Sequence, residues 1–145
     1  MTKTILMQYT DLLKEADEVR KRIETAEKEL AKIIEEGEVT DVVSGGEGGI
    51  QHFSITGFPY RDYARKRTLL KTRRLTLMAL EVEIDETLNS VYEFIKTIES
   101  SYDRRVISMR IIDKMTWRQI AQAMGGGNTE DGVRKAFERF IARGE

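Results

Sequence analysis

The polar residues between Arg118 and Arg139 are of types, and at spacings, that suit contact with DNA. They precede and follow a glycine-rich turn: Arg118, Gln119, Asn128, Thr129, Glu130, Asp131, Arg134, Lys135 and Arg139. Arginine and amide side chains can read base edges, and lysine and arginine also bind phosphates. The segment from Asp103 to Glu145 holds nine Lys/Arg against six Asp/Glu, although the whole chain has a net charge of −1. We therefore predict a DNA-contacting surface in this segment.

A second, denser run of basic residues lies in the middle of the chain, where Asp62 is the only acid: Arg61, Arg65, Lys66, Arg67, Lys71, Arg73 and Arg74. One interpretation is salt-sensitive contact with phosphates, which would involve Arg61, Arg65, Lys66, Arg67 and Lys71. The other is antiparallel charge pairing with residues 1–38, which hold seven basic and ten acidic groups. We favour the second interpretation because the two blocks would neutralise each other.

Enzymatic chemistry has little support in the composition. The chain has no cysteine and one histidine, so disulfides, thiolate metal sites and His-based catalytic sites are not expected. The glycines at 45–49 lack the following Lys-Ser/Thr of a phosphate-binding loop, and His52 is expected to be a lone surface residue. We expect no enzyme, no catalytic residue, no metal and no cofactor. No stretch approaches 18 apolar residues, so we also expect a cytoplasmic protein that does not bind a membrane.

Three short helices must position the C-terminal polar residues. The first has an apolar face formed by Val106, Ile107, Met109, Ile111 and Ile112. Thr116 is placed to cap a second helix from Trp117 to Met124, and the glycines at 125–127 should end it. Thr129 should cap a third helix, whose buried side is formed by Val133, Phe137, Phe140 and Ile141. This pattern predicts a helix-turn-helix, with the third helix in the major groove; the alternative is a three-helix protein-docking unit.

The run from Arg105 to Arg143 resembles region 4 of sigma factors of the sigma-70 type. It looks still more like the small phage-encoded regulators related to that region, the RinA-like and ArpU-like late-gene activators. The matching residues are Arg105 and Arg110, then residues 116–121, then Val133-Arg134-Lys135 before Phe137 and Phe140. The resemblance implies promoter DNA as ligand and RNA polymerase as a partner. Gly132 within the reading helix and the long glycine turn depart from the family pattern.

Two long helices are predicted before this segment. Residues 4–36 carry apolar residues at alternating steps of four and three, at Ile5, Tyr9, Leu12, Ala16, Val19, Ile23, Ala26, Leu30 and Ile33. This coiled-coil seam fits either a homodimer through the N-terminal helices or a hairpin with the second helix, residues 61–99. We expect the first helix to end at Gly37. We also expect a β-hairpin at about 38–57, with a first strand over 39–44.

The sequence therefore predicts a mainly α fold. Residues 1–100 would form a coiled-coil-like helical hairpin with a small β-hairpin insertion, and residues 101–145 a C-terminal helix-turn-helix. The predicted function is that of a phage-like, sequence-specific DNA-binding transcriptional regulator that contacts RNA polymerase. The alternatives are a small terminase-like DNA-packaging subunit and a protein-docking adaptor that does not bind DNA.

Overall fold

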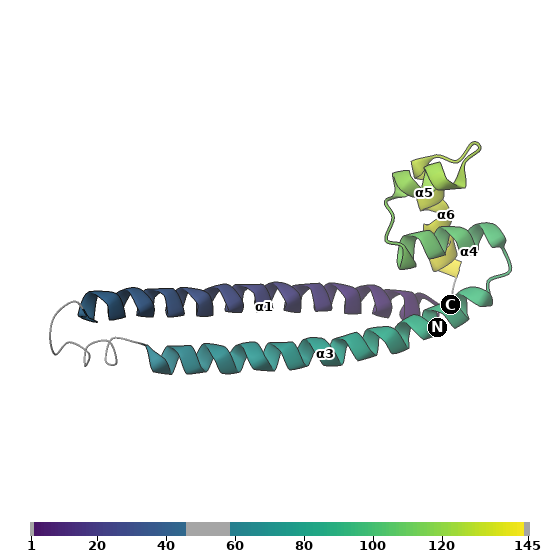
Figure 1. The fold of residues 1–145 in the computed structure, drawn as a ribbon. Coiled ribbons are helices and arrows are strands. Elements are labelled where there is room, and N and C mark those ends of the chain that lie inside the picture. Colours follow the sequence, from purple (N-terminus) through teal and green to yellow (C-terminus); the bar gives the residue numbers. More distant parts are fainter. Residues whose placement is uncertain (1, 46–58, 144–145) are drawn as a thin grey trace. The chain divides into compact units, whose positions relative to one another are not determined.

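The computed structural model describes residues 2–45 and 59–143, and describes side chains for 4–36 and 59–143. Every regular element in these ranges is a helix (Figure 1). The elements are α1 (Thr2–Gly45), α3 (Tyr60–Lys96), α4 (Ser101–Ile107), the π-helix η1 (Ser108–Ile112), α5 (Trp117–Met124) and α6 (Glu130–Arg143). The prediction of a mainly α fold is confirmed. None of the helices described is apolar enough over a sufficient length to cross a membrane.

The first long helix is longer than predicted. It does not end at Gly37, and the strand predicted over 39–44 is wrong, because α1 continues as a helix to Gly45. An internal glycine costs a helix only about 1 kcal/mol relative to alanine, and β-branched residues cost less. Gly37 and the β-branched residues after it therefore do not end α1. The rest of the predicted hairpin, residues 46–57 with His52, lies outside the residues that the structure describes.

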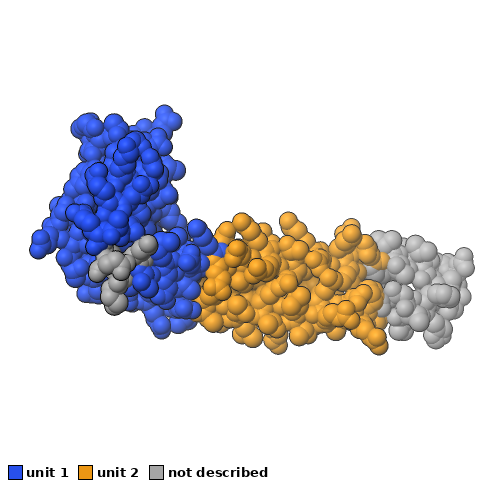
Figure 2. All heavy atoms as spheres, turned by 180° about the vertical axis from the view of Figure 1, so that it is seen from behind, with its two compact units in different colours: residues 1–14, 82–145 blue, residues 15–81 orange. Residues whose placement is uncertain are grey.

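The chain divides into two compact units (Figure 2). Unit 1 comprises residues 1–14 and 82–145, and unit 2 comprises residues 15–81. Each of the long helices, α1 and α3, contributes residues to both units. The two compact units do not test whether residues 1–100 and 101–145 fold as separate domains. That domain boundary stays a prediction.

Unit 2 is an antiparallel pair of helix segments joined by a narrow apolar seam and by ion pairs. The buried seam residues are Ala16, Val19, Ile23 and Ala26 on α1 and Leu70 and Leu80 on α3. Lys66 Nζ binds the carboxylate of Glu29, and Arg74 Nη2 lies 2.8 Å from Glu27 Oε2. Acidic residues of α1 therefore do pair with part of the basic run on α3, as the favoured interpretation of that run predicted. Within this unit the seam of α1 is covered by α3 of the same chain, as in the predicted hairpin.

Unit 1 contains a first apolar cluster, built from α1, α3, the segment between α3 and α4, α4 and η1. Its buried members are Leu6, Tyr9, Val91, Ile95, Ile98, Ile107 and Ile111. From α6, Phe140 packs against the cluster, with its ring centroid 6.3 Å from that of Phe94.

The predicted spacing of the α1 seam is confirmed, since most of its residues are buried and Ile5, Leu30 and Ile33 are half-buried. The prediction missed Leu6, which is 1% exposed.

A second apolar cluster holds the C-terminal helices of unit 1 together. Val106 of α4, Ile120 of α5 and Val133 of α6 are its buried centre. Half-buried residues surround them: Met109, Met115, Trp117, Ala121, Met124 and Phe137. Val106 belongs to this cluster while the next residue, Ile107, belongs to the first. Consecutive positions of α4 therefore join the two clusters into one support for α5 and α6.

Candidate nucleic-acid interface

The N-terminus of α5 is closed by a reciprocal pair of hydrogen bonds. The backbone N–H of Gln119 donates to Thr116 Oγ1 at 3.2 Å, and the backbone N–H of Thr116 donates to Gln119 Oε1 at 2.9 Å. This capping box confirms the predicted cap and satisfies amides that have no partner within the helix. It also occupies the carbonyl oxygen of Gln119, a predicted DNA-contacting residue. The side chain of Arg118, next to it, is exposed.

Two arginines on which the family resemblance rests contribute to the fold itself. The Arg110 guanidinium lies 4.1 Å from the centroid of the Trp117 ring and donates to the backbone oxygen of Met115 at 3.0 Å. Arg105 donates to the backbone oxygen of Ala123 at 3.5 Å. Both therefore tie α4 and η1 to the α5 region.

The turn between α5 and α6 depends on its glycines and on Asn128. Gly125 and Gly126 have φ values of 68° and 58°, a conformation that favours glycine, and α5 ends at Met124 as predicted. Asn128 Nδ2 donates to the backbone oxygen of Gly125 at 2.7 Å. Its Oδ1 accepts from the Tyr102 hydroxyl at 3.1 Å. Asn128, predicted to contact DNA, is therefore engaged at both ends in holding the turn.

Thr129 caps α6, as predicted. Its Oγ1 accepts a hydrogen bond from the backbone N–H of Gly132 at 3.0 Å. A Cβ added at Gly132 would lie 2.9 Å from that same oxygen, which is closer than normal packing permits. The glycine that departs from the family pattern is therefore explained by the cap. Glu130 and Asp131 follow Thr129 in the first turn, where the helix dipole favours negative charge.

Arg134 and Lys135, two cations predicted to contact DNA, are held by carboxylates of their own helix. Arg134 binds Asp131 through Nη2 and Glu138 through Nη1, the latter at 3.1 Å. Lys135 Nζ lies 2.9 Å from Asp131 Oδ2. Hydrogen bonds from Lys135 and then Arg134 lower the pKa of Asp131, and the bond to Asp131 raises the pKa of Arg134. The spacings of three and four residues that bring these groups together are visible in the sequence.

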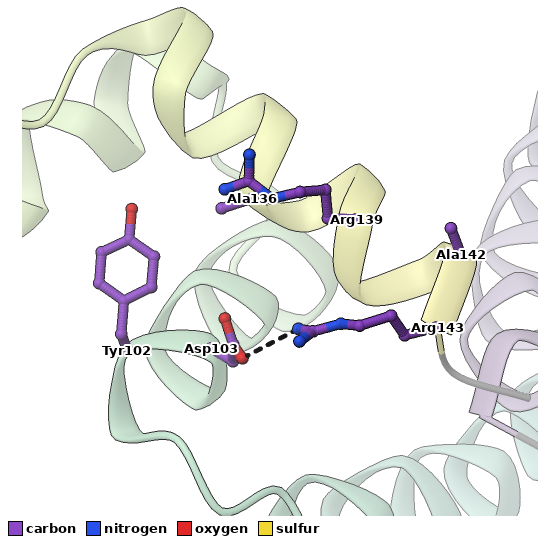
Figure 3. Close-up of a pocket in the computed structure, with 6 residues that line it drawn as sticks. All are labelled: Tyr102, Asp103, Ala136, Arg139, Ala142 and Arg143. Atoms are coloured by element: carbon purple, nitrogen blue, oxygen red, sulfur yellow. Dashed lines mark ion pairs between the residues drawn. The ribbon is translucent and has the colours of Figure 1, made fainter.

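A pocket of about 450 Å³ lies between α4 and the C-terminal half of α6 (Figure 3). Arg143 points across it to Asp103, with 3.6 Å between Nη2 and Oδ2. Arg139 extends away from that ion pair, and no interaction with another described residue is found for its guanidinium. Arg139 is therefore exposed and open to an outside anion.

The cations without a partner among the described residues are spread over several elements. In unit 1 they include Arg118, Arg139 and Lys114, all exposed. Lys114 was not predicted; it has a φ of 55° and stands in the turn before α5. In unit 2 Arg61, Arg67 and Lys71 are equally free, whereas Lys66 is paired with Glu29 and Arg65 lies 4.0 Å from Asp62. The cations among the predicted DNA-contacting residues thus divide into paired ones and free ones.

The described residues contain no group of three or more His, Cys, Asp or Glu placed to hold a metal ion. The polar groups of the candidate interface are free cations, surface carboxylates and the capped N-termini of α5 and α6. The sequence matches no family model, no curated protein and no solved structure.

Proposed function

We propose that α5, the glycine turn and α6 form a helix-turn-helix that binds double-stranded DNA, and that the chain is a phage-like transcriptional regulator. The observation that carries this proposal is the packing of α5 on α6. Ile120 and Val133 are both 0% exposed, so the two helices share one core. The opposite side of α6 is left exposed at Asp131, Lys135 and Glu138. A short helix supported in this way is suited to enter a major groove.

In this proposal the free and the paired cations have different roles. Arg118 and Arg139 bind phosphates and set the position of α6, because neither must leave a partner to do so. Arg134 and Lys135 read base edges after exchanging Asp131 and Glu138 for DNA. The released carboxylate of Asp131 can then accept a hydrogen bond from the amino group of a cytosine. RNA polymerase is the second partner that the family resemblance implies.

Fluorescence anisotropy with labelled random duplexes tests the phosphate-binding role. The affinity of the full chain should fall as salt rises. Arg118→Ala with Arg139→Ala should lower the slope of log affinity against log salt by about two. Lys14→Ala with Lys28→Ala removes the same charge from exposed positions of α1 and is the matched control. Equal slopes for the two double variants would remove Arg118 and Arg139 from the interface.

A protein-docking adaptor that does not bind DNA is the second candidate. It is favoured by the exposed acids of α6, because Glu130, Asp131 and Glu138 accompany Arg134 and Lys135. These three carboxylates and two cations carry a net charge of −1. Absence of a salt-dependent mobility shift with mixed DNA sequences would select the adaptor.

A further inference from the structure

Helix α3 has an exposed apolar stripe on the side that does not face α1. Leu75, Met78 and Val82 are 60%, 61% and 59% exposed, and they follow one another at steps of three and four along this one continuous helix. Residues at such steps lie on a single face. Ala79 is exposed next to them. On a helix surrounded only by water this face would normally be polar, so the stripe indicates a partner.

Charges of opposite sign flank the stripe. Arg67 and Lys71 precede it, while Asp85 and Glu86 follow it, and all four are exposed. No ion pair with another described residue is found for any of them. Lys71 and Glu86 lie at the same sequence distance on either side of the peptide bond between Met78 and Ala79.

We propose that this face of α3 binds α3 of a second copy of the chain, antiparallel, about a two-fold axis near Met78 and Ala79. A two-fold interface must be complementary to itself, and this arrangement brings Lys71 of each copy to Glu86 of the other. It also places Leu75 of each copy near Val82 of the other. A parallel arrangement would oppose like charges. Binding of DNA to the basic end would leave the apolar stripe and the acidic end without a partner.

This dimer goes beyond the proposed DNA-binding function, because it needs no DNA and uses a different helix. Sedimentation equilibrium of the full chain alone should show a dimer. Met78→Glu should raise the dissociation constant on the order of 100-fold, because it places a charge twice in an apolar contact. Leu69→Glu is the matched control. Leu69 is 44% exposed, but it lies nine residues before Met78, which is about two and a half turns and therefore the opposite face of α3. The Leu69→Glu variant should leave the dissociation constant unchanged.

Exchanging the charges tests the antiparallel arrangement. Lys71→Glu or Glu86→Lys alone should weaken the dimer about tenfold, because each variant creates two repulsive pairs. The double exchange should restore the affinity. Circular dichroism checks that each variant remains helical. A wild-type chain that is monomeric at every concentration would overturn the proposal. A dimer that Met78→Glu does not weaken, or a double exchange that restores nothing, would overturn it equally.

Discussion

Unit 1 and unit 2 are both helical but are held together differently. The largest fully buried side chains all lie in unit 1: Leu6, Val91, Val106, Ile107, Ile120 and Val133. In unit 2 the seam includes Ala16 and Ala26, which bury little area, and the remaining contacts include exposed ion pairs such as that of Arg74 with Glu27. Unit 1 is therefore stabilised by large buried side chains, whereas unit 2 has a narrower apolar seam to which exposed ion pairs add little.

The difference bears on function. A helix that is placed on DNA must keep its position when its surface side chains exchange partners, and a buried core achieves this. Ion pairs on a helix surface contribute little and weaken with salt. Unit 1 thus has the kind of support that a reading helix requires, whereas unit 2 presents cations without a comparable core.

The largest expected effect comes from making the same substitution in each unit. Ile120→Ala should lower the free energy of unfolding of unit 1 by about 4 kcal/mol, and Ile23→Ala that of unit 2 by about 2 kcal/mol. Ile120 is 0% exposed among three helices, whereas Ile23 is 9% exposed on a seam between two. The fluorescence of Trp117, the only tryptophan, reports unfolding of unit 1, and circular dichroism reports all helices. Equal losses would contradict the proposed difference.

Removing cations should sharpen the comparison on the binding side. Arg134→Ala with Lys135→Ala should abolish preference for the cognate duplex, because each well-placed pairing of a side chain with a base edge supplies about 1–3 kcal/mol of discrimination. The melting temperature should hardly change, because both residues are in exposed ion pairs. Arg61→Ala with Arg67→Ala in unit 2, outside the proposed interface, should leave that preference unchanged. Unchanged affinity of the first variant for its cognate duplex would remove Arg134 and Lys135 from base reading.

The glycine at the start of α6 provides a smaller test, within unit 1 alone. Gly132→Ala should have almost no net effect, since a gain of about 1 kcal/mol in helix propensity is offset by displacement of the Thr129 cap. In a Thr129→Ala background the cap is already absent. There Gly132→Ala should stabilise by up to about 1 kcal/mol. Chemical denaturation of the four chains of this cycle measures the coupling, and additive effects would show that the hydroxyl does not limit position 132.

The smallest expected effect is a response to acid. The hydrogen bond from Lys66 lowers the pKa of Glu29 below its usual 4.5. A carboxylate with a lowered folded pKa contributes stability above pH 4.5, and that stability is lost as pH falls through the folded pKa. Glu29→Gln should therefore reduce the loss of melting temperature below that pH. Glu24→Gln, at an exposed carboxylate of α1 without an ion pair among the described residues, is the control; an equal change for Glu24 would argue that the ion pair of Glu29 does not cause the response to acid.

Local patterns predicted much of this structure. The steps of three and four along α1, the caps at Thr116 and Thr129 and the end of α5 before the glycine turn each depend on neighbouring residues, and all are confirmed. The antiparallel charge pairing was also predictable, because an acidic and a basic block face each other when two long helices pair.

Other features depend on choices that a pattern leaves open. α1 continues past Gly37 because the cost of one glycine is small, and sequence alone did not decide between helix and strand after it. The π-helix at Ser108–Ile112 was not predicted; in it the Asp113 N–H donates to the Ser108 oxygen. Asp131 and Glu138 lie at spacings from Arg134 that permit ion pairs, but whether the pairs form depends on side-chain rotamers. The free state of Arg118 and Arg139 likewise depends on what surrounds them in three dimensions.

Selection of bound duplexes from a random pool, run with the full chain at two salt concentrations, tests the proposed DNA-binding role of α5 and α6 most directly. We expect a common sequence motif to be recovered, and to become more dominant at the higher salt as phosphate-only binding weakens. Recovery of an unenriched pool at both salt concentrations would contradict the proposed function.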